Sequence, residues 1–294
     1  MKKICIVGLI GRPNVGKSTL MNNILNCNLS IVSNIPQTTR DEIKGIYNDE
    51  EYQIIFIDTP GIHKSRNLLS EKLNEKSYSI LKNIDLLLFL SPANEEIGSG
   101  DKFIIKKIQE NNVENKIAII TKIDLINENE LLNNKADQLK SYGFQTILGI
   151  GKDLKNTYKD LLDEIKKYAY ESEPLYSEDQ FTDVSMRFIA KEEIREAALE
   201  HLYEELPHSI AVQIDSFIEQ EDTKPYLIDA TIYVKKESQK GILIGKNASM
   251  IKLISTKARK KMEDFFEHRV YLKINVKVNE NWVDNENKIK NMGY

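Results

Sequence analysis

The sequence predicts an α/β domain with a parallel, doubly wound sheet, followed by a smaller α+β domain. Short apolar runs alternate with helical stretches through residues 1–170, as in a parallel sheet covered by helices on both faces. A polar, acidic segment containing Pro174 follows at 171–180, and beyond it come a long helix and two half-buried strands. The length of 294 residues also favours two domains. We therefore expect domains at 1–170 and 181–294, joined by a linker at 171–180.

The apolar runs of the first domain are short and uninterrupted, which is typical of strands buried on both faces. They lie at 4–10, 52–57, 86–90, 117–120 and 144–148. Helical stretches between and after them lie at 101–109, 130–141 and 158–168. In such sheets ligands bind beyond the carboxyl ends of the strands, and the polar motifs described next follow those ends.

The first apolar run leads into a glycine-rich loop and then a helical stretch. The loop reads Gly11-Arg12-Pro13-Asn14-Val15-Gly16-Lys17-Ser18. Strand, loop and helix in this order form a P-loop, whose backbone N–H groups and helix N-terminus bind phosphates. Lys17 is expected to reach the β- and γ-phosphates, and Ser18 to offer its hydroxyl to Mg²⁺. The alternative is that the pattern occurs by chance, but the apolar strand before it and the helical stretch after it argue against a chance match. The chain is therefore predicted to bind a nucleoside triphosphate.

A second motif, Asp58-Thr59-Pro60-Gly61, ends the apolar run at 52–57. Asp58 can hold Mg²⁺ through water, and the Gly61 N–H can bond the terminal phosphate. Thr38 or Thr39 would complete the Mg²⁺ coordination from a segment that orders with GTP, and the sequence leaves the choice between them open. An ordinary turn after a strand is the alternative interpretation of this motif.

The motif Thr121-Lys122-Ile123-Asp124, at the end of the run 117–120, indicates the base. Asp124 can accept hydrogen bonds from the ring N–H and the exocyclic amine of guanine, a donor pair that adenine lacks. The stem of Lys122 can lie over the base, and Thr121 can hydrogen-bond to the phosphate-binding loop. GTP is therefore favoured over ATP.

Composition limits the remaining possibilities. The chain is 41% hydrophobic and 29% charged, so it can build ordinary cores. No apolar run approaches the roughly 20 residues of a membrane span, and a cytoplasmic location is expected. Cys5 and Cys27 are expected to be reduced thiols and not a disulfide. The net charge of −4 gives no overall sign of nucleic-acid binding.

The second domain is predicted to contain a helix, two strands, a short helix, a turn, a longer helix and a closing strand. Their ranges are 186–206, 209–215, 228–234, 241–244, 245–248, 249–266 and 270–278. Between residues 235 and 261, nine lysine or arginine residues stand against one acidic residue, whereas 191–222 hold two basic and ten acidic residues. A positive face around the turn would attract phosphates. A solvated basic helix face is the alternative.

This order of elements resembles the type II KH domain, whose Gly-x-x-Gly loop clamps single-stranded RNA. The resemblance implies RNA contacts from the turn and nearby basic residues, namely Lys240, Gly245, Lys246, Asn247, Ala248, Lys252, Lys257 and Arg259. Ala248 replaces the last glycine of the loop. If that position needs a positive φ, alanine is strained there by roughly 1 kcal/mol or more. We expect instead that Ala248 begins the following helix, where it costs nothing.

The motifs together resemble the Era family of bacterial GTPases. The likeness rests on 11–18, Pro36-Gln37-Thr38-Thr39-Arg40, 58–61 and 121–124, with further stretches at 237–245, 257–259 and 281–282, and covers nearly the whole chain. It implies a slow, Mg²⁺-dependent GTPase switch that binds the 3′ end of 16S ribosomal RNA and assists assembly of the small (30S) ribosomal subunit. It further implies a monomer with peripheral contact to the inner membrane surface. It also implies that a backbone N–H of Gly151 or Lys152 contacts the base oxygen.

Two residues bear on hydrolysis. Ile62 occupies the place of the water-orienting Gln of Ras-like proteins, as in other Era-like GTPases. Asn14 lies where related GTPases use Asn to hold K⁺ beside the phosphates, and such a cation could neutralise transition-state charge. We therefore expect slow, potassium-stimulated hydrolysis that depends on Asn14, Lys17, Ser18 and Gly61. The alternative is that Asn14 only stabilises the loop.

Two rival functions share some of these features. GTPases that serve transfer-RNA modification share the Arg-Pro-Asn loop, but they carry an added catalytic domain and a terminal Cys motif that this sequence does not contain. A constitutive RNA-binding protein with a decayed nucleotide site is suggested by Gly151 and Lys152, which replace the usual Ser-Ala. The intact Lys17, Asp58 and Asp124 argue against decay.

Overall fold

The computed structural model describes residues 1–32, 38–65, 67–127, 129–203, 205–221 and 223–294. The chain divides into two compact units. One comprises Met1–Val32, Thr39–Arg66 and Ser70–Asp183, and most of the other is Val184–Tyr294. The segment 171–180, expected to be a linker, therefore belongs to the first unit, and the boundary falls after Asp183.

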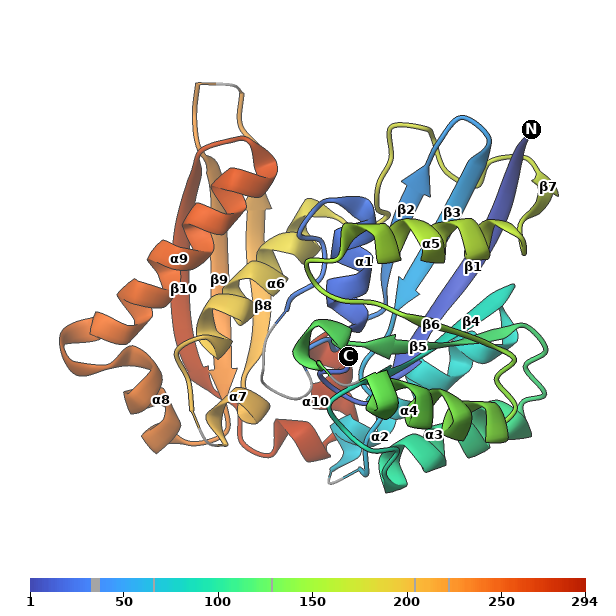
Figure 1. The fold of residues 1–294 in the computed structure, drawn as a ribbon. Helices are drawn as coiled ribbons and strands as arrows, with labels where there is room; N and C mark the ends of the chain where they lie inside the picture. The colour runs from blue at the N-terminus through green and yellow to red at the C-terminus, as the bar shows by residue number, and fades with distance from the viewer. Residues whose placement is uncertain (33–37, 66, 128, 204, 222) are drawn as a thin grey trace. The chain divides into compact units, whose positions relative to one another are not determined.

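The first unit is built on a sheet with the strand order β2-β3-β1-β4-β5-β6 (Figure 1). These strands are β1 (Lys2–Gly11), β2 (Ile43–Asn48), β3 (Tyr52–Asp58), β4 (Leu86–Pro92), β5 (Lys116–Thr121) and β6 (Thr146–Gly149). β1 is parallel to β3 and β4, and β4, β5 and β6 are parallel to one another. The predicted parallel sheet is confirmed. Two antiparallel strands, β2 beside β3 and β7 (Tyr170–Ser172) beside β1, were not predicted.

Helices cover both faces of this sheet. They are α1 (Lys17–Leu25), α2 (Leu68–Ser79), α3 (Ser99–Glu110), α4 (Asn129–Ser141) and α5 (Lys155–Lys166), with short 3₁₀ turns η1 (Ile80–Lys82) and η2 (Ile123–Leu125). Figure 1 shows α1 and α5 on one face and α2, α3 and α4 on the other. On the second face Phe89 of β4 stacks on Phe144 at 5.3 Å between ring centroids, in a core shared with α3 and α4. This core fixes the strand ends that carry the polar motifs.

The residues before the unit boundary are attached to β2 and β3. The fully buried side chain of Gln53 accepts hydrogen bonds from the N–H groups of Leu175 (2.8 Å) and Tyr176 (3.1 Å) and donates one to the Tyr176 carbonyl (2.9 Å). Further along, Thr182 forms an antiparallel bridge with Gly45 of β2. The acidic composition of this segment suggested a free linker because it gives no sign of these backbone partners.

The second unit has the predicted order of elements. It contains α6 (Met186–Leu199), α7 (Leu206–Ser209), β8 (Ala211–Ile218), β9 (Tyr226–Val234), α8 (Glu237–Ile244), η3 (Lys246–Ala248), α9 (Ser249–Phe266), β10 (Val270–Val278), η4 (Trp282–Asp284) and α10 (Glu286–Asn291). Its sheet has the order β10-β9-β8, with β10 parallel and β8 antiparallel to β9. Figure 1 shows α6 and α9 side by side against this sheet.

The first helix of this unit is shorter than predicted. The expected helix at 186–206 ends at Leu199, and a separate turn, α7, begins at Leu206 with Pro207 in its first positions. The helix buries an apolar side that includes Ile189, Ile194 and Ala197. The apolar spacing of the sequence did not show where the helix ends.

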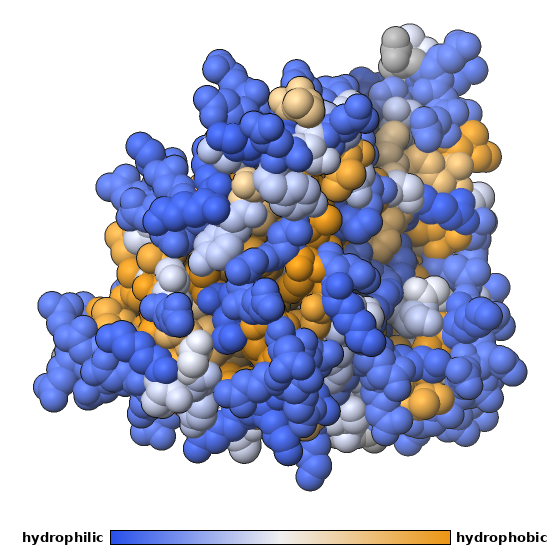
Figure 2. Space-filling view, turned by 90° about the vertical axis from the view of Figure 1, so that its right-hand side faces the viewer, coloured by the Kyte–Doolittle hydropathy of each residue, from blue (hydrophilic) through white to orange (hydrophobic). Residues whose placement is uncertain are grey.

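Some large apolar side chains are exposed at the surface, among them Phe103, Tyr203 and Ile242. Figure 2 shows one face of the molecule on which hydrophilic residues predominate, with apolar residues visible between them. In the described parts of the chain, none of the helices has the length and apolar character needed to cross a membrane.

Candidate functional site

The phosphate-binding loop connects β1 to α1. Two residues of the loop have left-handed backbone conformations, Asn14 with φ 61° and Gly16 with φ 103°. Glycine adopts such a conformation without strain and asparagine tolerates it. Gly16 precedes Lys17 at the start of α1, so the N-terminus of this helix faces the loop. The sequence Asn14-Val15-Gly16 therefore allows the tight turn that directs backbone N–H groups toward a bound phosphate.

Lys17 is buried and held by the loop itself. Its Nζ donates to the carbonyls of Arg12 (3.2 Å) and Gly11 (3.5 Å). Burial lowers the pKa of Lys17, and the negative charge of Asp58 opposes this effect. A phosphate is the kind of anion that would stabilise the charged form of this lysine in place of the carbonyls.

Three side-chain oxygens converge beside Lys17 in a way that suits Mg²⁺. The hydroxyl of Ser18 donates to Asp58 Oδ2 (2.7 Å) and lies 3.1 Å from the hydroxyl oxygen of Thr39. Asp58 is fully buried, and its Oδ1 has no hydrogen-bond partner among the described residues. Burial raises the pKa of Asp58, against the effects of Lys17 and Ser18. An unpartnered buried carboxylate oxygen next to two hydroxyls fits a hard divalent cation that prefers oxygen ligands.

The segment after Asp58 packs directly against the loop. A Cβ at Gly61 would lie 2.6 Å from both Cα and N of Pro13, so only glycine permits this approach. The N–H of Ile62 donates to the carbonyl of Gly11 (3.1 Å), and the hydroxyl of Thr59 donates to the carbonyl of Leu9 (2.8 Å). Gly61 is thus placed beside the loop, as the predicted contact with a terminal phosphate requires.

Ile62 is turned away from the nucleotide side. Its side chain is 1% exposed and belongs to the core that contains Ile10 and Phe89. It therefore offers no group to orient a water molecule, in line with its apolar chemistry. The backbone of this segment remains available at the site.

The guanine motif is joined to the phosphate loop. The hydroxyl of Thr121 donates to the carbonyl of Val15 (2.6 Å), which confirms the expected bond between this threonine and the loop. Lys122 has a left-handed conformation (φ 58°) and is followed by Asp124 in η2. The backbone N–H of Lys152 donates to Asp124 Oδ1 (3.0 Å). The motifs at 121–124 and 151–152 are therefore brought together from two strand ends.

Gly151 is spatially constrained by the same carboxylate. A Cβ at this position would lie 3.0 Å from Asp124 Oδ1 and 2.8 Å from Cδ1 of Leu154. The glycine that replaces a more usual serine thus lets the backbone pass close to Asp124. Loss of the usual side chain leaves the backbone contact to a base possible.

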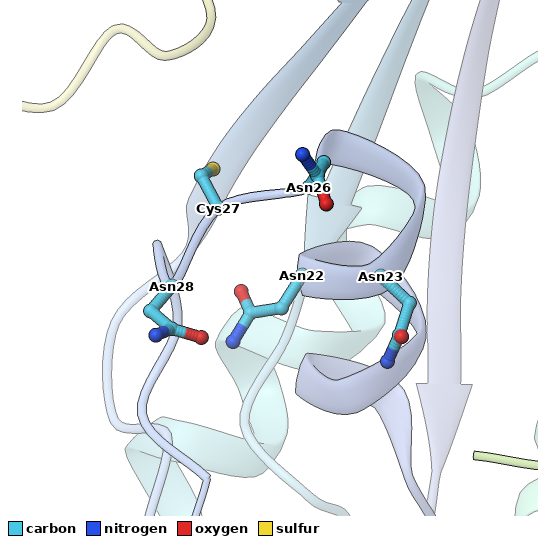
Figure 3. Close-up of a pocket in the computed structure, with 5 residues that line it drawn as sticks. All are labelled: Asn22, Asn23, Asn26, Cys27 and Asn28. Carbon is cyan, nitrogen blue, oxygen red and sulfur yellow. The ribbon is translucent and has the colours of Figure 1, made fainter. Parts of the chain in front are cut away.

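A pocket of about 310 Å³ lies at the end of α1, and four of its five lining residues are asparagines (Figure 3). Asn22 accepts from the N–H groups of Leu29 and Ser30 (3.1 and 2.9 Å) and donates to the Ser30 carbonyl (2.7 Å). Asn22 therefore fixes the backbone at Leu29 and Ser30, shortly after the end of α1. Pro36 and Gln37, which contribute to the family resemblance, lie outside the described residues.

The turn in the second unit differs from expectation at one residue. Ala248 has φ 60° and ψ 25°, and Asn247 has φ 53°. The expectation that Ala248 would be the first helical residue is therefore wrong, because α9 begins only at Ser249. The left-handed region crowds an alanine Cβ against the backbone, at a cost of roughly 1–2 kcal/mol. The strained alternative is the one that the chain adopts.

The residues predicted to meet RNA differ in their exposure and in their ion pairs. Lys246, Asn247 and Lys252 are exposed at the turn and the first turns of α9. Lys257 pairs with Glu200 (2.9 Å), and Arg259 pairs with Glu263 (3.1 Å). Nζ of Lys240 lies 3.8 Å from a carboxylate oxygen of Glu237. Gly245, at the start of the turn, has a positive φ of 73°. The local positive charge is therefore strongest at the turn and weaker along the helix, where acidic partners offset it.

Comparison with known proteins bears on both units. Residues 6–122 match the family model described as 50S ribosome-binding GTPase, and residues 205–283 match the KH domain. The GTPase Era of Mycoplasmopsis agalactiae is 52% identical over 292 residues, which cover 99% of each chain. That of Mycoplasmopsis pulmonis is 55% identical over 290 residues, 98% of each chain.

Solved structures of two relatives agree with the fold over nearly the whole chain. One is Era in complex with MgGDPNP and nucleotides 1506–1542 of 16S ribosomal RNA, with a TM-score of 0.95, 33% identity and coverage of 100% of this chain and 99% of that one. The other is a variant of Aquifex aeolicus Era bound to GDP·AlF4⁻, with a TM-score of 0.94, 34% identity and 99% coverage of both chains.

The fold and the two sites define a P-loop GTPase joined to a KH domain. The full-length identity to the curated relatives is specific enough to go further. The chain belongs to the Era family of GTPases and hydrolyses GTP.

Proposed function

We propose that this chain is a GTP-dependent switch that binds the 3′ end of 16S ribosomal RNA through its KH domain and assists assembly of the small ribosomal subunit. The proposal rests on the presence of a nucleotide site and a KH domain in one chain. A relative that matches this chain over nearly its full length was solved with MgGDPNP and nucleotides of 16S ribosomal RNA together. RNA binding would centre on Lys246, Asn247 and Lys252. A peripheral contact with anionic membrane lipids would draw on the same lysines and compete with RNA.

In the nucleotide site, Lys17 would exchange its loop carbonyls for the β- and γ-phosphates. Ser18, Asp58 and Thr39 would hold Mg²⁺, with Thr39 favoured over Thr38 because its hydroxyl lies 3.1 Å from that of Ser18. The cation supplies positive charge that offsets the negative charge on the phosphate oxygens during transfer. The N–H of Gly61 would donate to the terminal phosphate, and Asp124 with the backbone at 151–152 would select guanine.

Asn14 would hold a potassium ion beside the phosphates. Support comes from the lack of any polar group on the buried Ile62 and from the left-handed conformation of Asn14 within the phosphate loop. Hydrolysis is then expected to be faster in K⁺ than in Na⁺, and to lose this preference in Asn14→Ala. Equal turnover of the parent chain in both cations would refute the potassium site without affecting the GTPase assignment.

The RNA part of the proposal is tested with fluorescent oligonucleotides of the 16S ribosomal RNA 3′ end and the full chain. Affinity is measured by anisotropy with a non-hydrolysable GTP analogue, with GDP and without nucleotide, and a scrambled oligonucleotide serves as control. We expect tighter binding to the 3′-end sequence and a dependence on nucleotide. Equal affinity in all three states would remove the switch, and equal affinity for the scrambled sequence would remove the proposed target.

Lys17→Ala tests the nucleotide part. It is expected to abolish GTP hydrolysis and to leave RNA binding without nucleotide unchanged. Lys140→Ala, on the exposed side of α4, is the matched control and should behave as the parent chain. Retained GTP turnover in Lys17→Ala, or equal binding of ATP and GTP by the parent chain, would contradict the assignment of these residues.

A further inference from the structure

The phosphate loop is held from outside the nucleotide site by a charged cluster. Nη2 of Arg12 lies 2.7 Å from Glu95 Oε2, and its Nε lies 2.9 Å from Asp101 Oδ2. Burial lowers the pKa of Arg12, but the two carboxylates outweigh this effect and raise it. Asp101 is fully buried, whereas Glu95 is partly exposed. The guanidinium of Arg12 therefore forms ion pairs with both Glu95 and Asp101.

The start of α3 packs directly on the arginine stem. A Cβ at Gly100 would lie 2.8 Å from Cδ of Arg12, so the absence of a side chain at Gly100 lets the arginine stem lie against the start of the helix. The same Asp101 Oδ2 that meets Arg12 also accepts a hydrogen bond from the N–H of Gly98 (3.2 Å), just before the helix. One carboxylate oxygen thus joins the helix start to the phosphate loop.

The connection between β4 and α3 is fixed on its other side by a buried lysine. Nζ of Lys135, from α4, donates to the carbonyls of Pro92 (2.5 Å) and Glu95 (2.6 Å). Lys135 as a whole is only 5% exposed. The N–H of Ala93 donates to the carbonyl of Thr121 (2.7 Å). This connection therefore touches the guanine motif as well as the phosphate loop.

The backbone of Arg12 leads into the reactive part of the site. Its carbonyl accepts from Lys17 Nζ (3.2 Å), and the neighbouring carbonyl of Gly11 accepts from the N–H of Ile62 (3.1 Å). A change in the orientation of Arg12 would consequently be felt by Lys17 and by the segment that carries Gly61.

We propose that Asp101 is a positioning residue for GTP binding and hydrolysis. It anchors Arg12 outside the phosphate site and so keeps the loop backbone in the shape from which Lys17 reaches the phosphates. Arg12, neutralised by Asp101 and Glu95, contributes no side-chain charge to the phosphates. Asp101 acts through Arg12 and touches no reacting atom.

The main test is Asp101→Asn in the full chain, because it keeps the size of the side chain and removes its charge. We expect release of a fluorescent GDP analogue to become about tenfold faster and kcat to fall about tenfold, which corresponds to the loss of one charge-assisted interaction. Asp137→Asn is the matched control, since Asp137 is an exposed aspartate paired with Lys140 on α4. It should leave both quantities unchanged.

A double-mutant cycle separates positioning from general stability. Arg12→Met combined with Asp101→Asn should be no worse than Arg12→Met alone, because Arg12→Met already removes the interaction with Asp101. Glu95→Gln, at the exposed partner, serves if the buried variant folds poorly, and should speed GDP release by about two- to threefold. A merely structural role would lower the melting temperature and leave GDP release and kcat of the folded protein unchanged. That result, or additive effects in the cycle, would overturn the proposal.

Discussion

Left-handed backbone conformations occur at eight described residues that are not glycine, and four of them lie in the predicted nucleotide- and RNA-binding motifs. Asn14 is in the phosphate loop, Lys122 is in the guanine motif, and Asn247 and Ala248 are in the turn predicted to bind RNA. Asparagine tolerates this conformation better than alanine or lysine, because its side chain can hydrogen-bond locally. Ala248 is therefore strained at a position where the local shape matters for binding.

Replacing Ala248 by glycine should stabilise the second unit by about 1 kcal/mol, since glycine has no Cβ to crowd the left-handed backbone. The free energy of unfolding in urea measures the effect. Ala258→Gly, within the same α9 helix, should have the opposite sign and cost about 1 kcal/mol or more, because Ala258 is helical and buried. Equal destabilisation by both substitutions would contradict the strain at Ala248.

Thr121→Val should speed GDP release about tenfold. The change keeps the side-chain shape but leaves the buried carbonyl of Val15 without its 2.6 Å hydrogen bond, at a cost of about 1–3 kcal/mol. Release of a fluorescent GDP analogue measures it. Thr157→Val removes a comparable bond to the Leu154 carbonyl at the exposed start of α5 and should leave the rate unchanged.

Between elements, α6 and α9 are joined by charged side chains. Lys261 pairs with Glu196 (2.6 Å) and Glu200 (2.7 Å), and Lys257 pairs with Glu200. Glu193 lies on the same face of α6 as Glu196. Its carboxyl is largely buried, and its Oε2 has no hydrogen-bond partner among the described residues. Burial raises the pKa of Glu193 to about 8, and the negative charges of Glu196, Glu192 and Glu200 act in the same direction. The positive charge of Lys261 lowers this pKa but does not outweigh them.

This carboxyl makes the second unit less stable as pH rises. Between the unfolded pKa, near 4.5, and about 8, the folded chain holds a proton that the unfolded chain has lost, so the contribution of Glu193 to stability falls through that window. Glu193→Gln should therefore raise the melting temperature at pH 8 more than at pH 5. Glu280→Gln, at an exposed position, should shift it equally little at both. A pH-independent gain in Glu193→Gln would show that the shifted pKa is absent.

Over the whole molecule, charge is distributed unevenly although the net value is only −4. The basic residues between 235 and 261 stand against an acidic stretch at 191–222, and part of each neutralises the other through the α6–α9 pairs. The exposed Lys246 and Lys252, at and just after the turn, form no ion pair among the described residues and are available to meet a polyanion, since long-range attraction depends on charge that is not locally paired.

The salt dependence of RNA affinity should reveal this division. Each phosphate contact with a single strand contributes about 0.7 to the slope of log affinity against log salt, so a Lys246→Gln, Lys252→Gln double variant should flatten that slope by about 1.4. Lys257→Gln should change it less, because Glu200 already pairs with this lysine. Equal effects from all three lysines would show that the pair with Glu200 opens on binding.

The parallel strands could be predicted because burial on both faces demands continuous apolar runs such as 86–90 and 117–120. β2 and β7 could not, because an edge strand with one exposed face can contain lysine, glycine and glutamate, as β2 and β7 do. The helix end at Leu199 was missed because the apolar spacing continues past it to Leu202 and Leu206 in another conformation.

By itself, the sequence determined the chemistry of the molecule: phosphate, guanine and polyanion binding follow from residue types at fixed spacing along the chain. Only the tertiary structure decided which groups meet. It placed Thr39 beside Ser18, joined Thr121 to the loop, committed Arg12 to Asp101 and Glu95, and set Ala248 in the left-handed region. The spacing of residues within a motif can be seen directly in the sequence. The contacts at Thr39, Thr121 and Arg12 join residues far apart in sequence, so they depend on how the strands and helices pack.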